Sequence, residues 1–197
     1  MTTTTHRQDQ DLARRAAQGD EQAWRTLYDE TCQPLFNFLC FQAGDRELAR
    51  DLLQDTYLKA YRYLDSYRGQ GSLLSWLRGI ALRLCLDWRR GLGRRLRQLV
   101  SIHREDGDLD IPAPDRSESR EAGLSVTGQA FQAALAELST KQRACLVLHE
   151  LEDLPFADVA REVGCAEATA RVHHHRAKQR MRELLDYRVD AMGGQQI

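Results

Sequence analysis

Hydrophobic positions recur every three or four residues along most of this 197-residue chain, and no stretch shows the alternation of a β-strand. Between residues 51 and 64 this spacing predicts one buried stripe on a helix. Gly69 and Gly71 then break the pattern, and Ser72 is suited to cap a second helix that runs to about Arg90. We therefore expect an all-α protein. The predicted stripe consists of Leu52, Leu53, Tyr57, Ala60, Tyr61 and Leu64.

Two more helices are predicted before this segment. The first covers about Asp9 to Gln18 and ends at Gly19, and Asp20 caps the second. Pro34 is expected to bend or interrupt that second helix, because proline removes a backbone donor and crowds the preceding turn. Together the helices of this half can bury one core. The apolar stripe of the second helix includes Ala23, Trp24, Leu27, Tyr28, Leu35, Phe38 and Leu39.

The last third of the chain predicts a helix-turn-helix. Ser139 with Gln142 three residues later is a capping-box pattern that opens a helix. Pro155 suits the first turn of the next helix, and the turn at 164–166 leads into a basic helix over about 167–185. Its early side chains on the side opposite the apolar stripe would reach base edges in a major groove. These are Thr169, Arg171, Val172, His175 and Arg176.

The region between these halves lacks helical periodicity and contains Pro112, Pro114 and several glycines. A segment this long without periodicity indicates a flexible linker between two small helical domains. The predicted organisation is therefore a first domain, a flexible acidic linker, a helix-turn-helix domain and a C-terminal tail, at residues 8–92, 93–127, 128–186 and 187–197.

The net charge of −1 conceals a segmental distribution. The stretch 88–104 contains six arginines and no carboxylate, 105–121 is strongly acidic, and the last helix is basic again. Charged runs are often only solvated faces, but clustering by segment favours contact with nucleic acid.

Other classes of protein find little support in the sequence. No apolar run is long enough to span a bilayer, and the N-terminus lacks the apolar core of a signal peptide. The five cysteines are widely spaced with no CxxC pair, which indicates reduced thiols in a cytoplasmic protein rather than disulfides or a common zinc site. No nucleophile–base grouping or phosphate loop emerges, so we expect neither an enzyme nor a cofactor.

The three consecutive histidines 173–175 suggest a metal site at first sight. Neighbouring helical residues diverge by about 100° each, so these three side chains cannot converge on one ion, and no metal is expected there. His174 shares the apolar stripe of Ala170, Ala177 and Met181 and is predicted to be a satisfied core histidine. A further hypothesis is that acid weakens this domain, because charging a buried imidazole is unfavourable.

Two regions of the chain together resemble those of a known family. Asp51, Leu52, Leu53, Gln54 and Asp55 match its Asp-Leu-hydrophobic-Gln-acidic motif, and Trp76, Ile80, Ala81, Asp87, Arg89 and Arg90 fit the helix that follows. Residues 155–160 and His175-Arg176-Ala177 mirror its C-terminal domain. The chain thus resembles the extracytoplasmic-function (ECF) sigma factors of bacterial RNA polymerase. One departure is Arg83, where the family usually has Asn.

The resemblance implies a transcription initiation factor that binds core RNA polymerase, recognises promoter DNA as duplex and as melted non-template strand, and is held inactive by an anti-sigma factor. It places polymerase binding at Asp51, Gln54 and Asp55, and recognition of the minus-thirty-five element on the basic helix. It also implies a set of residues that contact the minus-ten element, namely Tyr67, Arg68, Gln70, Ser72, Trp76, Arg83, Arg89 and Arg90.

One alternative from another class stays open at this point. The chain could be a stand-alone regulator that binds duplex operators through residues 155–182, with its first domain as a sensor or dimeriser. That hypothesis offers no reason for the motif at 51–55 or for the glycine-broken loop after it.

Overall fold

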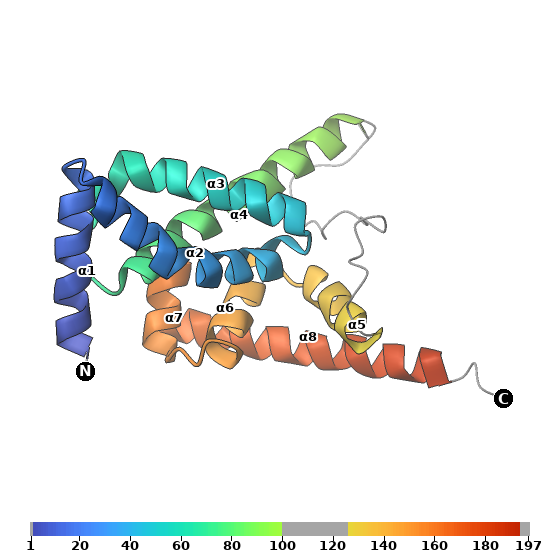
Figure 1. Ribbon diagram of the computed structural model, residues 1–197. Coiled ribbons are helices and arrows are strands. Elements are labelled where there is room, and N and C mark those ends of the chain that lie inside the picture. Colours follow the sequence, from blue (N-terminus) through green and yellow to red (C-terminus); the bar gives the residue numbers. More distant parts are fainter. Residues whose placement is uncertain (1, 100–125, 194–197) are drawn as a thin grey trace. The chain divides into compact units, whose positions relative to one another are not determined.

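The computed structural model describes residues 2–99 and 126–193, and every regular element within these ranges is a helix (Figure 1). The all-α prediction is therefore confirmed. The chain divides into two compact units. One contains the chain up to Cys85 together with Arg161–Gly164, and the other contains Leu86–Ala160 and the chain from Cys165 on.

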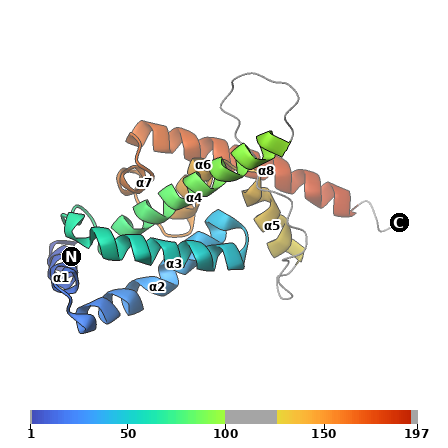
Figure 2. The same ribbon diagram turned by 90° about the horizontal axis from the view of Figure 1, so that it is seen from above.

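The first unit is built from α1 (Thr2–Ala17), α2 (Glu21–Ala43), α3 (Arg46–Tyr63), a 3-10 turn (Leu64–Ser66) and α4 (Leu73–Leu99) as far as Cys85. Helices α2 and α3 form an antiparallel pair whose members lie side by side in both ribbon views (Figures 1 and 2). α1 begins well before the predicted start but ends, as predicted, just before Gly19.

The predicted caps explain where these helices begin and end. Asp20 Oδ1 accepts hydrogen bonds of 3.0 Å from the backbone N–H groups of Gln22 and Ala23. At the other end of α2, Gly44 adopts a left-handed conformation (φ 71°), and its N–H donates to the carbonyl of Cys40. Asp45 then caps α3 by accepting from Leu48 N at 2.8 Å. Such caps satisfy backbone groups that a helix end leaves without partners.

Pro34 does not interrupt α2, so the expected break is absent. The helix continues unbroken from Glu21 to Ala43. Leu27 before the proline and Leu35 and Phe38 after it are at most 1% exposed. Burial on both sides of Pro34 offsets the local cost of the missing backbone hydrogen bond.

The buried face of α3 differs from the predicted stripe. Its buried residues are Leu48, Ala49, Leu52, Thr56 and Ala60. Leu53 and Tyr57 are only partly covered, and Tyr61 is 67% exposed. The assignment of Tyr61 to the core was therefore wrong, and on α2 the same holds for Tyr28, which is 45% exposed. The large aromatic side chains satisfied the spacing rule, but the fully buried positions belong to smaller residues one position away, Thr56 and Ala60.

Helix α4 is longer than predicted. Ser72 caps it through its Oγ, which accepts from Ser75 N at 3.1 Å. The helix then continues to Leu99, so the first residues of the predicted linker are helical. Gly91 and Gly93 lie inside it, because a glycine disfavours a helix by only about 1 kcal/mol and does not end it. The rest of the predicted linker, 100–125, lies outside the described residues.

The second unit contains α5 (Val126–Ala136), α6 (Thr140–Glu150), most of α7 (Phe156–Val163) and α8 (Glu167–Gly193). The predicted capping box is present, since the Ser139 side chain accepts from Gln142 N and the Gln142 side chain accepts from Ser139 N. Pro155 lies just before α7, and its carbonyl accepts from Val159 N at 3.1 Å. α8 extends into the predicted tail.

The core of this unit includes an arginine that the sequence did not single out. Arg143 on α6 is 1% exposed, and its guanidinium donates to the carbonyls of Ala136 at 3.0 Å and Leu138 at 3.3 Å. These bonds fix the end of α5 against α6. The apolar part of the core comes from side chains that include Leu135, Leu138, Val147, Leu148, Val159, Ala170, Ala177 and Met181.

Candidate functional surfaces

The acidic face of α3 consists of Asp51, Gln54 and Asp55, the three residues predicted to bind polymerase. All three are exposed, and the spacing i, i+3, i+4 places them on one side of the helix. None of them has a hydrogen bond or ion pair with the rest of the described chain. These groups are therefore available to an outside partner.

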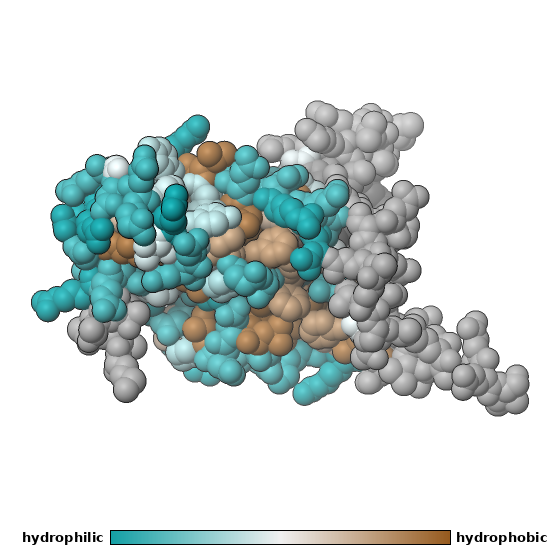
Figure 3. Space-filling view, viewed as in Figure 1, coloured by the Kyte–Doolittle hydropathy of each residue, from teal (hydrophilic) through white to brown (hydrophobic). Residues whose placement is uncertain are grey.

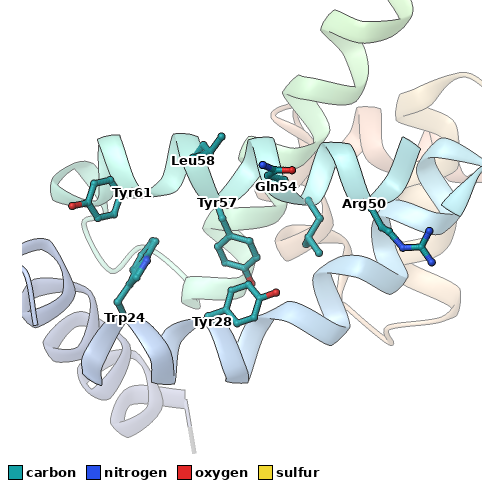
Figure 4. A pocket seen from close by; sticks show the side chains of 8 residues that line it. Trp24, Tyr28, Arg50, Gln54, Tyr57, Leu58 and Tyr61 are labelled. Carbon is teal, nitrogen blue, oxygen red and sulfur yellow. The ribbon is translucent and has the colours of Figure 1, made fainter. Parts of the chain in front are cut away.

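A hollow of about 450 Å³ lies beside this face, between α2 and α3 (Figure 4). Gln54 and Arg50 form part of its wall, and Trp24 and Tyr28 line it from α2. The rings meet in pairs across the gap: Trp24 packs edge-on against Tyr61 with centroids 5.5 Å apart, and Tyr28 lies 4.8 Å from Tyr57.

Hydrophobic side chains show over α2 and α3 on a face of the first unit that is otherwise mainly hydrophilic (Figure 3). Sequence reasoning assigned the aromatics of the hollow to the core and so missed this surface. The available signal was that α3 has more large apolar residues than one helix face can bury.

The loop after α3 is held in place by its own contacts and by α1. Gly69 and Gly71 both have positive φ angles, 71° and 105°. The carbonyl of Arg68 accepts from Gln10 Nε2 at 3.1 Å, and the carboxylate of Asp9 accepts from Leu73 N at 2.9 Å. The loop is therefore preorganised rather than free.

The residues predicted to contact the minus-ten element differ in how they are presented. Arg68 and Gln70 are exposed. Tyr67 is half-buried, donates its hydroxyl to the carbonyl of Gly71 at 2.8 Å and packs against Trp76 with ring centroids 5.9 Å apart. Burial, helped by nearby Asp9, raises the pKa of Tyr67 to about 12. Tyr67 therefore stays neutral and orders the loop.

Ser72 and the arginines of α4 complete this group. The Ser72 hydroxyl is used as a helix cap. Trp76 is half-buried. Arg83 and Arg90 are exposed and Arg89 is half-buried. Arg90 lies 3.9 Å from Asp87 in an exposed pair, which is worth little in water and leaves the arginine free to exchange partners.

The exposed side of α8 carries the residues predicted to read duplex DNA. Thr169, Arg171, Val172, His175 and Arg176 are all exposed, whereas Ala170, His174, Ala177 and Met181 are buried on the opposite side. Arg171 is held by Glu167 at 2.6 Å and lies 4.5 Å above the ring of Phe156. The turn before α8 places Gly164 at φ 69°, which permits the helix-turn-helix geometry.

His174 is the satisfied core histidine that the sequence predicted. Its Nε2 lies 2.7 Å from Glu150 Oε1 on α6, and its side chain is 11% exposed. Burial lowers the pKa of His174 despite the opposing effect of Glu150. A lowered pKa means that the unfolded chain binds the proton more tightly, so acid weakens the folded state below about pH 6.5. The direction agrees with the hypothesis of acid weakening, which stays a prediction.

Comparison with known proteins extends over most of the chain. Residues 27–95 match the family model for Sigma-70 region 2, and residues 128–181 match that for Sigma-70 region 4. The ECF RNA polymerase sigma factor SigM of Mycobacterium tuberculosis is 31% identical over 181 residues, which cover 92% of this chain and 86% of that protein. The RNA polymerase sigma-H factor of Pseudomonas aeruginosa is 28% identical, covering 92% of this chain and 95% of that one.

Solved structures show the same fold. The sigma factor RpoE of Bartonella quintana, solved in complex with the anti-sigma factor NepR, superposes with a TM-score of 0.64 at 27% identity, covering 83% of this chain and 96% of that chain. CnrH, solved with the cytosolic domain of CnrY, gives a TM-score of 0.63 at 22% identity, covering 91% of this chain and 97% of that chain.

Proposed function

Because the chain belongs to the extracytoplasmic-function sigma factors of bacterial RNA polymerase, we propose that it recruits the core enzyme to specific promoters through three separate surfaces. It is a transcription initiation factor that binds core polymerase, selects promoters and promotes their melting. Catalysis belongs to the polymerase. The first domain at 8–92 and the helix-turn-helix domain at 128–186 carry these surfaces in our proposal, joined by the linker at 93–127.

The acidic face of α3 is the proposed polymerase-binding surface. Asp51, Gln54 and Asp55 are exposed together and have no bonds to the described part of their own chain. Exposed carboxylates without internal partners suit a basic surface on another protein. Replacing one of them with a positive charge would make the contact repulsive. This is the observation that carries the proposal, since no internal structural role accounts for these residues.

The loop at 67–72 and the arginines of α4 form the proposed minus-ten surface. Arg68 and Gln70 are exposed on a loop that α1 holds in place, so they can meet an unstacked base without first being ordered. Stacking of an unpaired base on an aromatic ring contributes about 1–3 kcal/mol to the free energy of binding a single strand. Arg83, Arg89 and Arg90 would neutralise neighbouring phosphates. Because the surface would bind the open strand in preference to the duplex, it would shift the promoter toward the melted state without the use of ATP.

The structure suggests different roles within the minus-ten group. Tyr67 and Ser72 each use their hydroxyl inside the protein, for Gly71 and for the cap of α4. We assign them mainly to positioning, whereas Arg68 and Gln70 make the direct contacts. Loss of the Ser72 cap would destabilise the start of α4 by about 1 kcal/mol. A substitution of Ser72 would therefore affect promoter melting by disturbing the loop.

The exposed side of α8 is the proposed minus-thirty-five surface. Helices of this kind enter the major groove with their early residues toward the base edges. Thr169, Arg171 and Val172 lie in the first turns and would contact bases, and His175 and Arg176 follow one turn later.

An anti-sigma factor is the proposed regulator. RpoE of Bartonella quintana, which is 27% identical to this chain, was solved with the anti-sigma factor NepR. We propose that a protein of this class covers the polymerase- and DNA-binding surfaces until a signal releases it. We also propose a cytoplasmic location, where polymerase acts. No helix in the described ranges is both long enough and apolar enough to cross a membrane.

The decisive experiment mixes the full chain with core polymerase and measures start-site-specific transcription from a promoter library. We expect Asp55→Arg to abolish both polymerase binding and transcription while the helical content stays unchanged, because an exposed charge reversal rarely unfolds a helix. Asp11→Arg is the matched control, since Asp11 is an exposed carboxylate of α1 that forms a surface pair with Arg14. Undiminished polymerase binding by Asp55→Arg would refute the assignment of the acidic face.

A further inference from the structure

A cluster of metal-ligating side chains joins α6 to α8 on the side opposite the proposed DNA-reading face. His149 and Glu150 are the last two residues of α6, and His174 lies on the buried side of α8. One ligand atom from each of the three lies within 4.8 Å of the other two. None of the roles proposed above uses this cluster.

His149 is held in the form that binds a metal. Its Nδ1 lies 2.8 Å from the carbonyl oxygen of Leu154, to which it donates. The ring proton is therefore on Nδ1, and Nε2 carries the free lone pair. Metal-binding histidines commonly donate their other ring nitrogen to a backbone carbonyl in this way.

The rings around the cluster fix its orientation. His149 stacks on Phe156 with centroids 4.0 Å apart, and His174 meets both rings edge-on, at 4.8 Å from His149 and 5.2 Å from Phe156. The two imidazoles therefore cannot turn away from each other without losing aromatic contacts. Because the two imidazole rings are already ordered, binding an ion between them would cost little further conformational entropy.

Glu150 supplies the anionic ligand. Its Oε1 lies 2.7 Å from His174 Nε2 and 3.0 Å from Lys178 Nζ. These two hydrogen bonds hold the Glu150 side chain of α6 against α8. Its side chain is 39% exposed, so solvent and ions reach the cluster from this side.

From this geometry we propose that His149, Glu150 and His174 bind a divalent transition-metal ion of the zinc class. Two imidazoles and a carboxylate with an open fourth position form a ligand set that zinc accepts. Zinc bonds of about 2.0–2.2 Å place neighbouring ligand atoms about 3.4 Å apart. Glu150 Oε1 and His174 Nε2, now 2.7 Å apart, must therefore separate, while ligand atoms up to 4.8 Å apart must approach each other. The exposed Glu150 side chain can move in this way. The ion replaces the proton that His174 Nε2 donates to Glu150 Oε1. That proton moves to Nδ1 of the same His174 ring.

The positive neighbours set the cost of binding. Lys178 must leave Glu150 Oε1, and its side chain is 40% exposed and can turn into water. Arg171 stays over Phe156. The positive charges of Lys178 and Arg171 weaken the affinity of the site for a cation. The doubly charged ion, however, gains two nitrogen ligands that the Lys178 ammonium group cannot use. Binding would connect α6 to α8 and stabilise the unit that carries the recognition helix.

The test uses the metal-free full chain, kept reduced, titrated with Co²⁺ and with Zn²⁺. We expect one equivalent of Co²⁺ to bind and to give visible absorption bands without the near-ultraviolet band of a cobalt–thiolate bond. Zn²⁺ should compete for the site and raise the melting temperature by about 5 °C at saturation. The measurement involves neither polymerase nor DNA, so its failure would leave the proposed function untouched.

Variants decide which residues hold the ion. His149→Gln and Glu150→Gln should each weaken Co²⁺ binding by at least about tenfold and remove the Zn²⁺-dependent rise in melting temperature. His173→Gln is the matched control, since it removes a neighbouring histidine that is not part of the cluster, and it should bind like the unaltered chain. Three results would overturn the proposal: no saturation by about 1 mM metal, a thiolate band, or unchanged binding by His149→Gln.

Discussion

The hydroxyl groups of Thr31 and Tyr57 lie 2.8 Å apart and connect α2 to α3 beneath the hollow. Thr31 donates to the carbonyl of Leu27 at 2.6 Å, so Tyr57 is the donor in the bond between them. Burial is the main cause that raises the pKa of Tyr57. This polar contact inside an aromatic cluster fixes the register of α2 against α3, the helix that carries the acidic face.

Tyr57→Phe should therefore lower the free energy of unfolding by about 0.5–1.5 kcal/mol, the usual net value of one hydrogen bond. Urea denaturation followed by circular dichroism measures it. Tyr63→Phe is the control, because the Tyr63 side chain is 59% exposed and its loss of a hydroxyl should be nearly neutral. Equal effects of the two substitutions would show that the Thr31–Tyr57 bond does not stabilise the helix pair.

The loop at 67–72 offers a second test, at Gly69. Gly69 and Gly44 share a φ of 71°, but a Cβ at Gly69 would collide with the side chain of Gln10, whereas Gly44 has nothing within 4 Å. Gly69→Ala should cost about 1 kcal/mol more than Gly44→Ala, since Gln10 must give up its bond to the Arg68 carbonyl. In a Gln10→Ala background the difference between the two substitutions should vanish. A difference that persists there would mean that Gln10 is not what limits the loop.

Cys145 should be unreactive in the folded chain. It is fully buried, and burial raises its pKa to about 12. Only about one thiol in ten thousand is then ionised at pH 8, and the thiolate is the form that reacts. Iodoacetamide labelling followed by peptide mass spectrometry should leave Cys145 unmodified in the native protein and modify it in urea. Rapid native labelling of Cys145 would contradict its placement in the α6 core.

Arg176 should contribute charge to minus-thirty-five binding. It is exposed on α8 and, unlike Arg171, has no ion pair within the described residues. Arg176→Ala should weaken promoter binding by the holoenzyme and reduce the slope of log affinity against log salt by about one. Lys59→Ala removes an exposed charge on α3 that belongs to neither proposed DNA surface, and it should leave the slope unchanged. An unchanged slope for Arg176→Ala would place this side chain away from phosphate.

The sequence predicted the local features well because they depend on neighbours in the chain. The caps at Asp20, Ser72 and Ser139 and the left-handed turn at Gly164 need only a few adjacent residues. The buried stripe of α8, with His174 inside it, follows from spacing alone. The family motif at 51–55 also identified a face that proved to be exposed.

Predictions failed where burial depends on a second element. Tyr61 fits the apolar stripe of α3, but Thr56 and Ala60 are the residues that are fully buried, and Tyr61 stays 67% exposed. Arg143 looks like a surface residue in the sequence, yet backbone carbonyls at the end of α5 give it partners in the core. Pro34 remains helical because side chains on both sides of it are buried.

By itself, the sequence determined the helical class, most helix ends and the family, since periodicity and caps act over a few residues and a motif is read directly. Only the tertiary structure decided which aromatic rings stay at the surface and which groups meet across helices. The cluster of His149, Glu150 and His174 is of this second kind. His174 follows Glu150 by 24 residues in the chain, and only the packing of α6 against α8 brings the ligand atoms together.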